Sequence, residues 1–326
     1  MIKAVILFII GLVLLIKGGD WFVDGATGIA ERFHIPEILI GATVVSIGTT
    51  LPEVMVSATS AAKGIGDMAY GNAIGSIICN TALVSAITIA VKPALVEKKS
   101  LRFPVICFFI AAFFYSAVAY LAQGFSRATG IILLAMFVAY MVIVVRQAFK
   151  SPEGNGNVEE SEEEEADKDE PLWKEIILLV AGAAAIAVGA DLLVDNGTYI
   201  ATELGVPASV IALTFVALGT SLPELVTAIT SLAKGHGALS LGNVIGANLF
   251  NLVLVSGISI SIAPFKIPVE KTIAGMNASL VMDIPVMLFV MAFMTLPALV
   301  RGKLSRVQGI VLLAVYFAYV VCQFAL

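Results

Sequence analysis

Two stretches of this chain carry the same set of chemically active side chains. Residues 43–60 read TVVSIGTTLPEVMVSATS, and residues 214–231 read TFVALGTSLPELVTAITS. Each is an apolar segment with a glycine, neighbouring hydroxyl side chains, a proline and one glutamate, which is Glu53 in the first and Glu224 in the second. Because a carboxylate is costly at membrane depth, a glutamate in such a segment indicates a functional site.

The spacing around each glutamate brings oxygen atoms together. On a helix, Thr49 and Thr50 lie one turn before Glu53, so hydroxyl and carboxylate oxygens share a face. Pro52 lacks an amide N–H and its ring clashes with the carbonyl of Gly48, which predicts a broken helix with freed carbonyl groups. Hard cations take oxygen ligands of this kind, and Ca²⁺ accepts about 6–8 of them. The second stretch repeats the arrangement with Gly219, Thr220, Ser221, Pro223 and Glu224.

A second polar row follows each stretch, GNAIGSIICN at 71–80 and GNVIGANLFN at 242–251. The glycines predict close helix packing, and asparagines inside a membrane can join helices by hydrogen bonds. For Asn80 and Asn251 we favour contact with a cation or carboxylate over this packing role. Each row repeats every four residues and so faces one direction on a helix. The rows are Asn72, Ser76 and Asn80 in the first stretch and Asn243, Ala247 and Asn251 in the second.

The composition places both stretches inside a membrane. The chain has 326 residues, of which 59% are apolar and 13% charged, and its mean hydropathy is +1.00. Apolar runs of about 20 residues predict an all-α integral membrane protein and exclude an outer-membrane barrel. Ten transmembrane helices are expected at 2–24, 36–62, 67–91, 103–122, 127–148, 173–195, 207–233, 238–263, 277–300 and 304–325.

The chain is an internal duplication. With a constant offset of 171 residues, Lys17–Asn80 aligns without a gap to Val188–Asn251 and gives about 27 identities in 64 positions. The duplication divides the chain into a first five-helix repeat at 1–148, a linker at 149–172 and a second five-helix repeat at 173–326. Since five is odd, the second repeat enters the membrane in the opposite sense, an inverted arrangement typical of alternating-access transporters.

The distribution of basic residues predicts the orientation. If the N-terminus lies outside, the inner loops and helix ends hold about 14 of the 19 Lys and Arg residues. A multi-pass protein of the cell membrane is then expected, with both termini outside and linker 149–172 cytoplasmic. The linker is rich in Glu and Asp and predicts a solvated segment. A calcium-sensing linker is the less favoured alternative, because EF-hand spacing is missing.

Several function classes are disfavoured. Cys79, Cys107 and Cys322 lie in apolar runs without CxxC spacing, which favours buried small apolar residues over a disulfide or metal site. With only two histidines, a site for soft metals is also disfavoured. Nothing in the sequence indicates nucleic-acid binding, an enzyme or a bound cofactor, and without an ATP motif the driving force would be an ion gradient.

GTTLPE and GTSLPE, each followed by GNxxG, resemble the two alpha-repeats of the calcium/cation antiporter superfamily. The chain most resembles the prokaryotic sodium/calcium exchangers of that superfamily, over essentially its whole length. The resemblance implies a secondary antiporter that exchanges Ca²⁺ for Na⁺ by alternating access, with helices 1 and 6 moving against a fixed core of the four motif helices. The oligomeric state stays open.

The resemblance also implies a ligand set at a central site between the repeats. Glu53 and Glu224 would be the shared carboxylates for Ca²⁺ and Na⁺, and Asn80 and Asn251 would line the middle. The remaining ligands would be Thr49 and Thr220 near Ca²⁺, Thr50, Ser76 and the Ser46 carbonyl at one sodium site, and Ser221, the Ala217 carbonyl and position 247 at another.

Two positions depart from the family pattern. Position 247 is often serine but is Ala247 here, and position 251 is an aspartate in some members but is Asn251 here. Two carboxylates balance one Ca²⁺ or two Na⁺, whereas a third Na⁺ would leave a buried positive charge unless dipoles compensate it. The stoichiometry is therefore left open, and the case for potassium co-transport is weakened.

Alternatives to this reading remain. The coupling ion could be H⁺, because a desolvated glutamate can take up a proton. A cation channel is less favoured, and a non-transporting scaffold is the least favoured. Asp283 has no counterpart in the other repeat and is expected near the membrane edge. Four repeated acids are expected to make helix-end contacts, although their repetition leaves gating open: Asp20, Asp24, Asp191 and Asp195.

Overall fold

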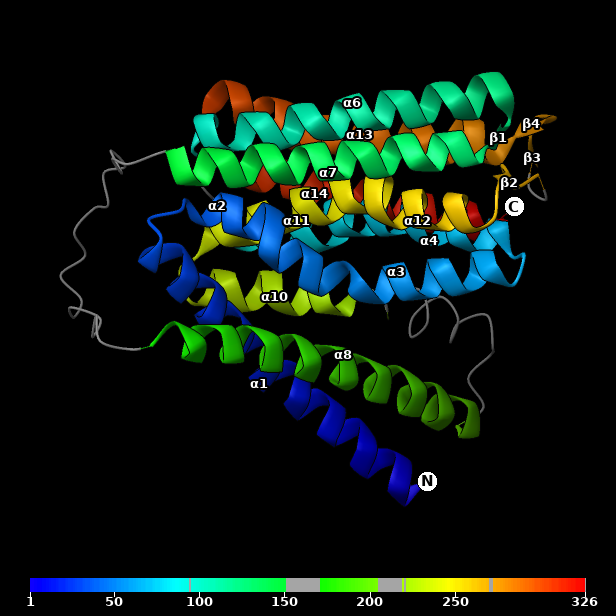
Figure 1. Cartoon of the computed structure of the whole chain (residues 1–326). Helices are drawn as coiled ribbons and strands as arrows, with labels where there is room; N and C mark the ends of the chain where they lie inside the picture. The colour runs from blue at the N-terminus through cyan, green and yellow to red at the C-terminus, as the bar shows by residue number, and fades with distance from the viewer. Residues whose placement is uncertain (94, 151–170, 205–218, 220, 270–271, 326) are drawn as a thin grey trace.

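The computed structural model describes residues 1–93, 95–150, 171–204, 219, 221–269 and 272–325. Within these ranges the protein is a helical bundle with two short two-stranded pieces (Figure 1). The predicted linker lies almost entirely outside the described residues, as do Ala217 and Thr220.

Helical turns written η are π-helical. In chain order the elements are α1 (Ile2–Arg32), α2 (Glu37–Ile40), η1 (Gly41–Val45), α3 (Ser46–Ala62), α4 (Gly66–Cys79), η2 (Asn80–Ser85), α5 (Ala86–Val91), α6 (Lys98–Ala122), β1 (Gly124–Phe125), α7 (Arg127–Lys150), α8 (Leu172–Glu203), α10 (Leu222–Ala233), α11 (Gly237–Phe250), η4 (Asn251–Val255), α12 (Ser256–Ile262), β2 (Phe265–Lys266), β3 (Thr272–Ile273), β4 (Met276–Asn277), η5 (Ser279–Asp283), α13 (Ile284–Arg301) and α14 (Arg306–Ala325).

Nine helices in the described part of the chain are long and apolar enough to cross a membrane. They correspond to nine of the ten predicted spans. The remaining prediction, 207–233, falls largely outside the described residues, and its described part contains the twelve-residue helix α10. The first and sixth spans are longer than predicted, because α1 continues to Arg32 and α8 to Glu203.

Related positions of the two halves have the same local structure. Helices α4 and α11 begin and end 171 residues apart, and the π-helical turns η2 and η4 begin at Asn80 and Asn251. Helices α1 and α8 also end 171 residues apart. Figure 1 shows α1 and α8 side by side with opposite chain directions. The repeat read from the sequence is thus visible in the backbone.

Pro52 does not break its helix, contrary to the prediction. Helix α3 runs through Pro52 to Ala62, and the irregular turn is η1, which lies before α3. In an apolar core, unpaired backbone groups are costly, so a helix keeps its hydrogen bonds on both sides of a proline. In the second half, Pro223 lies in the first turn of α10, where a proline costs no hydrogen bond.

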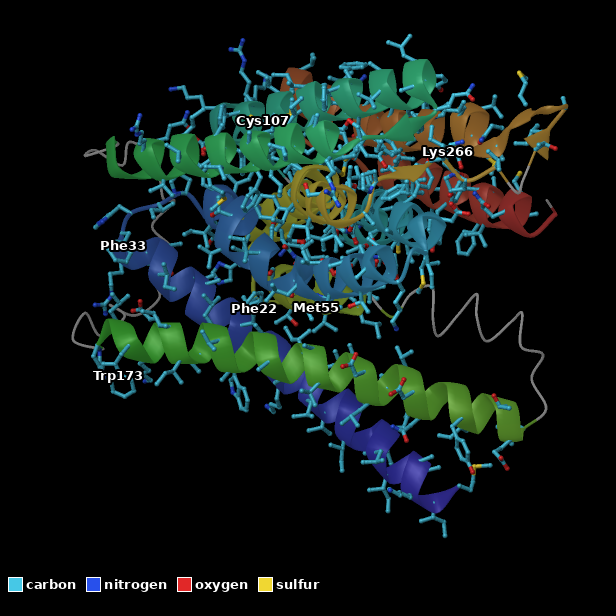
Figure 2. All side chains as sticks on the ribbon, turned by 45° about the vertical axis from the view of Figure 1, so that its right-hand side comes forward. Phe22, Phe33, Met55, Cys107, Trp173 and Lys266 are labelled. Carbon is cyan, nitrogen blue, oxygen red and sulfur yellow. The ribbon has the colours of Figure 1, made fainter. Side chains whose placement is uncertain are left out.

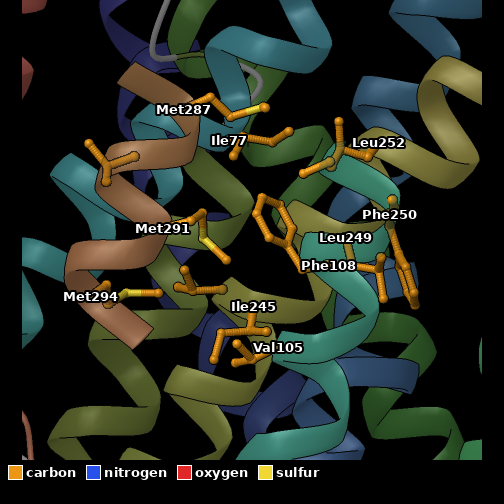
Figure 3. Close-up of a cluster of buried hydrophobic side chains, with 14 of the residues drawn as sticks. Ile77, Val105, Phe108, Ile245, Leu249, Phe250, Leu252, Met287, Met291 and Met294 are labelled. Carbon is orange, nitrogen blue, oxygen red and sulfur yellow. The ribbon is translucent and has the colours of Figure 1, made fainter. Parts of the chain in front are cut away.

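The motif helices form the centre of the bundle. In the spans Gly237–Ile262 and Gly66–Val91, 78% and 72% of the most apolar window is buried, against 28% for α1 and 22% for α8. Helix α13 covers one side of this centre with fully buried methionines, among them Met287 and Met291, which lie opposite Phe108 of α6 (Figure 3). Short pairings tie the halves at opposite ends, β1 with β2 and Leu95 with Lys303.

Helices α1 and α8 form a pair that lies against one side of the centre (Figure 1). Phe22 of α1 is buried between α8 and the rest of the bundle, whereas Trp173 at the start of α8 is exposed (Figure 2). The two backbones approach closely at glycines: a Cβ on Gly11 would lie 2.9 Å from the Gly189 carbonyl oxygen and 2.9 Å from the Leu193 nitrogen. Small residues permit such contacts between membrane helices.

We expect Gly11→Ala to destabilise the α1–α8 pair by about 1–3 kcal/mol, because its methyl group would meet backbone atoms that cannot move aside. Thermal unfolding in detergent measures the effect. The matched control is Gly28→Ala on the same helix, where the methyl group would meet the flexible side chain of Glu175. Equal melting temperatures for the two variants would contradict a tight backbone contact at Gly11.

Candidate functional site

Two glutamates from different halves of the chain are completely buried. Glu53 of α3 and Glu224 of α10 are both 0% exposed. Within the described part of the chain, none of their four carboxylate oxygens has a hydrogen-bond partner. The two side chains lie within electrostatic range of each other, as α3 packs against α10. Because burying carboxylates without partners is costly, a bound cation would stabilise this arrangement.

Asn80 and Asn251 lie at the same place in the two halves, as the first residues of η2 and η4. Both are 0% exposed, and neither the amide oxygen nor the amide nitrogen has a hydrogen-bond partner among the described residues. The turn η4, which begins with Asn251, packs against the helix α3 that carries Glu53, and η2, which begins with Asn80, packs against the helix α10 that carries Glu224. Wide π-helical turns occur frequently at functional sites.

Hydroxyl groups surround the glutamates. Thr50 and Ser221 are buried, and their hydroxyl groups have no partner in the residues described. The Thr49 hydroxyl donates to Asn243 Oδ1 at 3.2 Å. The Ser46 hydroxyl donates to the Gly41 carbonyl oxygen at 2.7 Å, and this hydrogen bond spans η1. Together with the glutamates and asparagines, these groups supply oxygen atoms alone, as a hard cation prefers.

The structure places nine of the eleven predicted site residues in these adjoining motif elements, all of them buried. The other two, Thr220 and Ala217, lie outside the described residues. The cation-binding role of all eleven remains a prediction. The nine are Ser46, Thr49, Thr50, Glu53, Ser76, Asn80, Ser221, Glu224 and Asn251.

Sequence reasoning missed the hydrogen bonds made by the asparagine of each GN pair. The side-chain oxygen of Asn243 accepts a hydrogen bond from the hydroxyl of Thr49, which belongs to the other half of the chain. Its counterpart Asn72 donates to Ser57 Oγ at 2.8 Å and to the Glu53 carbonyl oxygen at 3.2 Å. The repetition of the GN pair in both halves was the available signal, although its partners cannot be read from spacing.

The packing prediction for the glycines is confirmed in the second half. A Cβ on Gly242 or Gly246 would collide with the backbone of Ile38 or Ala42, so α11 lies directly against α2 and η1. For Gly71 and Gly75, no atom of the described residues lies within 4 Å of the added Cβ. The residues that correspond to Ile38 and Ala42 by the repeat are 209 and 213, outside the described ranges.

The repeated acids are not equivalent in the structure. Lys234 Nζ lies 2.6 Å from Asp24 Oδ1 and 3.7 Å from Asp20 Oδ1, so the loop after α10 is tied to α1. The related residues Lys63 and Asp195 make no ion pair with any residue that the structure describes. Because α1 continues to Arg32, the two acids of α1 lie further from its end than predicted.

Asp283 is a buried acid with hydrogen-bond donors around it. Asp283 ends η5 at the start of a membrane span, as predicted, and accepts hydrogen bonds from Tyr319 at 3.1 Å and Gln323 at 2.6 Å. Its charge therefore has donors, whereas Glu53 has none among the described residues.

The three cysteines are free: Cys79 is buried as expected, Cys107 is half-buried and Cys322 is exposed. For Cys322 the prediction of burial was wrong, because it lies near the end of the peripheral helix α14.

A small cavity reaches the site from the α1–α8 side. It is lined by Phe22 of α1, Ala183 of α8, Thr49 and Gly48 of α3 and Pro223 of α10. Phe22 lies directly against Gly48, where an added Cβ would be 2.9 Å from the ring. The α1–α8 pair thus covers the motif residues on this side.

Comparison with known proteins covers almost the whole chain. The family described as "Sodium/calcium exchanger protein" matches residues 3–146 and 174–325. The chain is 36% identical to the putative antiporter CaxA of Alkalimonas amylolytica and 29% identical to the sodium/calcium exchanger MaX1 of Methanosarcina acetivorans, with 98% of both chains covered in each case. A solved structure of the sodium-calcium exchanger NCX_Mj, soaked with Na⁺ and Sr²⁺, superposes with a TM-score of 0.82 at 31% identity and covers 98% of both chains.

We expect Glu53→Gln to stabilise the protein by about 1–3 kcal/mol in a buffer with chelator and without Na⁺, at a pH at which the wild-type carboxyl is ionised, because the amide carries no charge to bury. Thermal unfolding in detergent gives the difference. The control is Asp283→Asn, which removes a charge that does have hydrogen-bond donors and should not stabilise. A wild-type protein more stable than Glu53→Gln in this buffer would contradict the unpaired state of the carboxylate.

Proposed function

Because this chain belongs to the sodium/calcium exchanger protein family, we propose that it exchanges Ca²⁺ for Na⁺ across the cell membrane by alternating access. The observation that carries the proposal is the pair of completely buried carboxylates, Glu53 and Glu224, one from each half, which have no hydrogen-bond partner among the residues that the structure describes. Two such charges are neutralised by one Ca²⁺ or by two Na⁺. The two cations can therefore substitute for each other at one site.

The proposed ligands are the oxygen groups around the two glutamates. Ca²⁺ would take the carboxylates and the threonine oxygens of Thr49 and Thr220, and the amide oxygens of Asn80 and Asn251 would line the centre. Na⁺ would be held on one side by Thr50, Ser76 and the Ser46 carbonyl, and on the other by Ser221 and the Ala217 carbonyl. The similarity to the sodium-calcium exchanger NCX_Mj, with 98% of both chains covered, supports a site for these two cations.

The sodium sites are proposed to be unequal. Ser76 is buried and offers a hydroxyl group, whereas the related position holds Ala247, which is equally buried but has no oxygen on its side chain. The centre has two carboxylates, because residue 251 is an asparagine. Both features favour a small number of bound Na⁺, since each further cation would add an uncompensated buried charge.

The α1–α8 pair is proposed as the moving element. These helices are much less buried than the motif helices and contact each other more extensively than they contact the centre. Phe22 covers the cavity that reaches Thr49, so displacement of α1 would open the site from that side. We place both termini outside the cell and linker 149–172 in the cytoplasm, following the basic residues.

A sodium gradient should drive uptake of radioactive Ca²⁺ into vesicles that contain the wild-type protein. We expect Glu53→Gln to reduce this uptake on the order of 100-fold or more, because one of two charges that bind the cation is lost. Asp283→Asn is the control, and its uptake should stay close to that of the wild type. Ca²⁺ uptake driven by a proton gradient and indifferent to Na⁺ would instead identify H⁺ as the coupling ion, and passive currents would indicate a channel.

The ion pair of Lys234 with Asp24 should favour one orientation of the carrier. In an inverted repeat, the opposite orientation would break this pair and form the related one between Lys63 and Asp195. Lys234→Gln and Lys63→Gln should therefore shift the apparent Ca²⁺ affinity at a given membrane face in opposite directions, by about 2- to 5-fold. Affinities measured separately from the two faces of oriented vesicles test this. Shifts in the same direction for both variants would contradict the exchange of pairs.

A further inference from the structure

Asn243 connects the two halves at the proposed site without being one of the proposed ligands. It lies on α11, is 0% exposed, and its side-chain oxygen accepts a hydrogen bond from Thr49 Oγ1 at 3.2 Å. The hydroxyl of Ser46 lies 3.0 Å from its backbone carbonyl oxygen and 3.3 Å from its side-chain oxygen. The contact exists because Gly242 and Gly246, on either side of Asn243, bring α11 against η1 and the start of α3.

We propose that Asn243 is a positioning residue that turns the lone pairs of Thr49 toward the bound cation; this inference rests on the proposed function. A threonine hydroxyl has one proton and two lone pairs. When the proton is donated to Asn243 Oδ1, it is not turned toward the carboxylates and the lone pairs are free for a cation. Without the acceptor, the hydroxyl proton can turn toward the carboxylates and must be reoriented before a cation binds.

The proton of Ser46 does not compete strongly for the same acceptor. Its hydroxyl lies closest to the Gly41 carbonyl oxygen, at 2.7 Å, and is 3.3 Å from Asn243 Oδ1. A hydroxyl donates a single proton, so Thr49 is the main donor to the Asn243 side chain. The assignment of Asn243 therefore concerns Thr49 in particular.

The repeat gives Asn243 a different environment from its counterpart Asn72. The nitrogen of Asn72 donates to Ser57 Oγ, but the position related to Ser57 is Ala228. Accordingly, the nitrogen of Asn243 is buried with no hydrogen-bond partner in the described part of the chain. The side chain of Asn243 is thus held in place by its oxygen and not by its nitrogen, which ties its orientation to Thr49.

A purely structural role is the competing explanation, because buried asparagines also join membrane helices by hydrogen bonds. Asn248 provides the matched control for it. This residue lies on the same helix, is also 0% exposed, and donates to Thr81 Oγ1 at 2.7 Å, which is not one of the proposed ligands. Asn243→Leu and Asn248→Leu both remove a buried interhelical hydrogen bond, but only the first removes the acceptor of Thr49.

The test uses two measurements on the purified protein. The rise of the melting temperature with Ca²⁺ concentration gives the apparent Ca²⁺ affinity, and the melting temperature without Ca²⁺ gives the stability. Asn243→Leu should weaken Ca²⁺ binding about 10-fold. Asn243→Asp, which keeps an oxygen acceptor, should bind Ca²⁺ at least as tightly as the wild type. Asn248→Leu should lower the melting temperature and leave the Ca²⁺ affinity unchanged.

A double-mutant cycle shows whether Asn243 acts through Thr49. Thr49→Val combined with Asn243→Leu should bind Ca²⁺ no more weakly than Thr49→Val alone, because the acceptor has lost its donor. Additive losses, or an Asn243→Leu protein with wild-type Ca²⁺ affinity, would overturn the positioning role alone. A wild-type protein that binds no Ca²⁺ would overturn the proposed function and the positioning role with it.

Discussion

Two buried carboxylates, which have no partner in the described part of the chain, impose the main constraint on this protein. A charged group buried without partners costs more than most single interactions contribute, so the surrounding structure must be stable without them. The close packing of α11 against α2 and η1, at Gly242 and Gly246, meets part of this requirement. This packing also brings Asn243 of α11 to Thr49 and Ser46 of the first half.

The backbone around the carboxylates is irregular at related places. Asn80 and Asn251 each begin a π-helical turn, and η1 precedes Ser46 in the first half. Two of these turns are spanned by a serine hydroxyl: Ser46 donates to the Gly41 carbonyl oxygen at 2.7 Å across η1, and Ser256 donates to the Asn251 carbonyl oxygen at 2.9 Å across η4. These serines give hydrogen-bond donors to carbonyl groups at the start of η1 and η4.

The sequence was sufficient for nine of the ten predicted spans and for the burial of the described residues around Glu53 and Glu224, because each depends on composition or on local spacing. It was not sufficient for the π-helical turns or for the continuity of α3 through Pro52, since both depend on packing against other helices. The bonds of Asn243 to Thr49 and of Lys234 to Asp24 join residues far apart in the chain. Identical residues at related positions predict the same contacts in both halves. Lys234 pairs with Asp24, but its counterpart Lys63 makes no ion pair with a described residue.

The same electrostatic cost that defines the site also explains why the proposed function would be an exchange. If the α1–α8 pair moved while the site was empty, it would close over two buried carboxylates that have no hydrogen-bond partner among the described residues, and the side chains of Asn80 and Asn251 would be equally unpaired there. With one Ca²⁺ or two Na⁺ bound, the charge is balanced and the amide oxygens have a partner. The barrier would therefore be lower for the loaded carrier than for the empty one. A carrier that crosses only when loaded must return with a second cation, which couples the two ions without any further device.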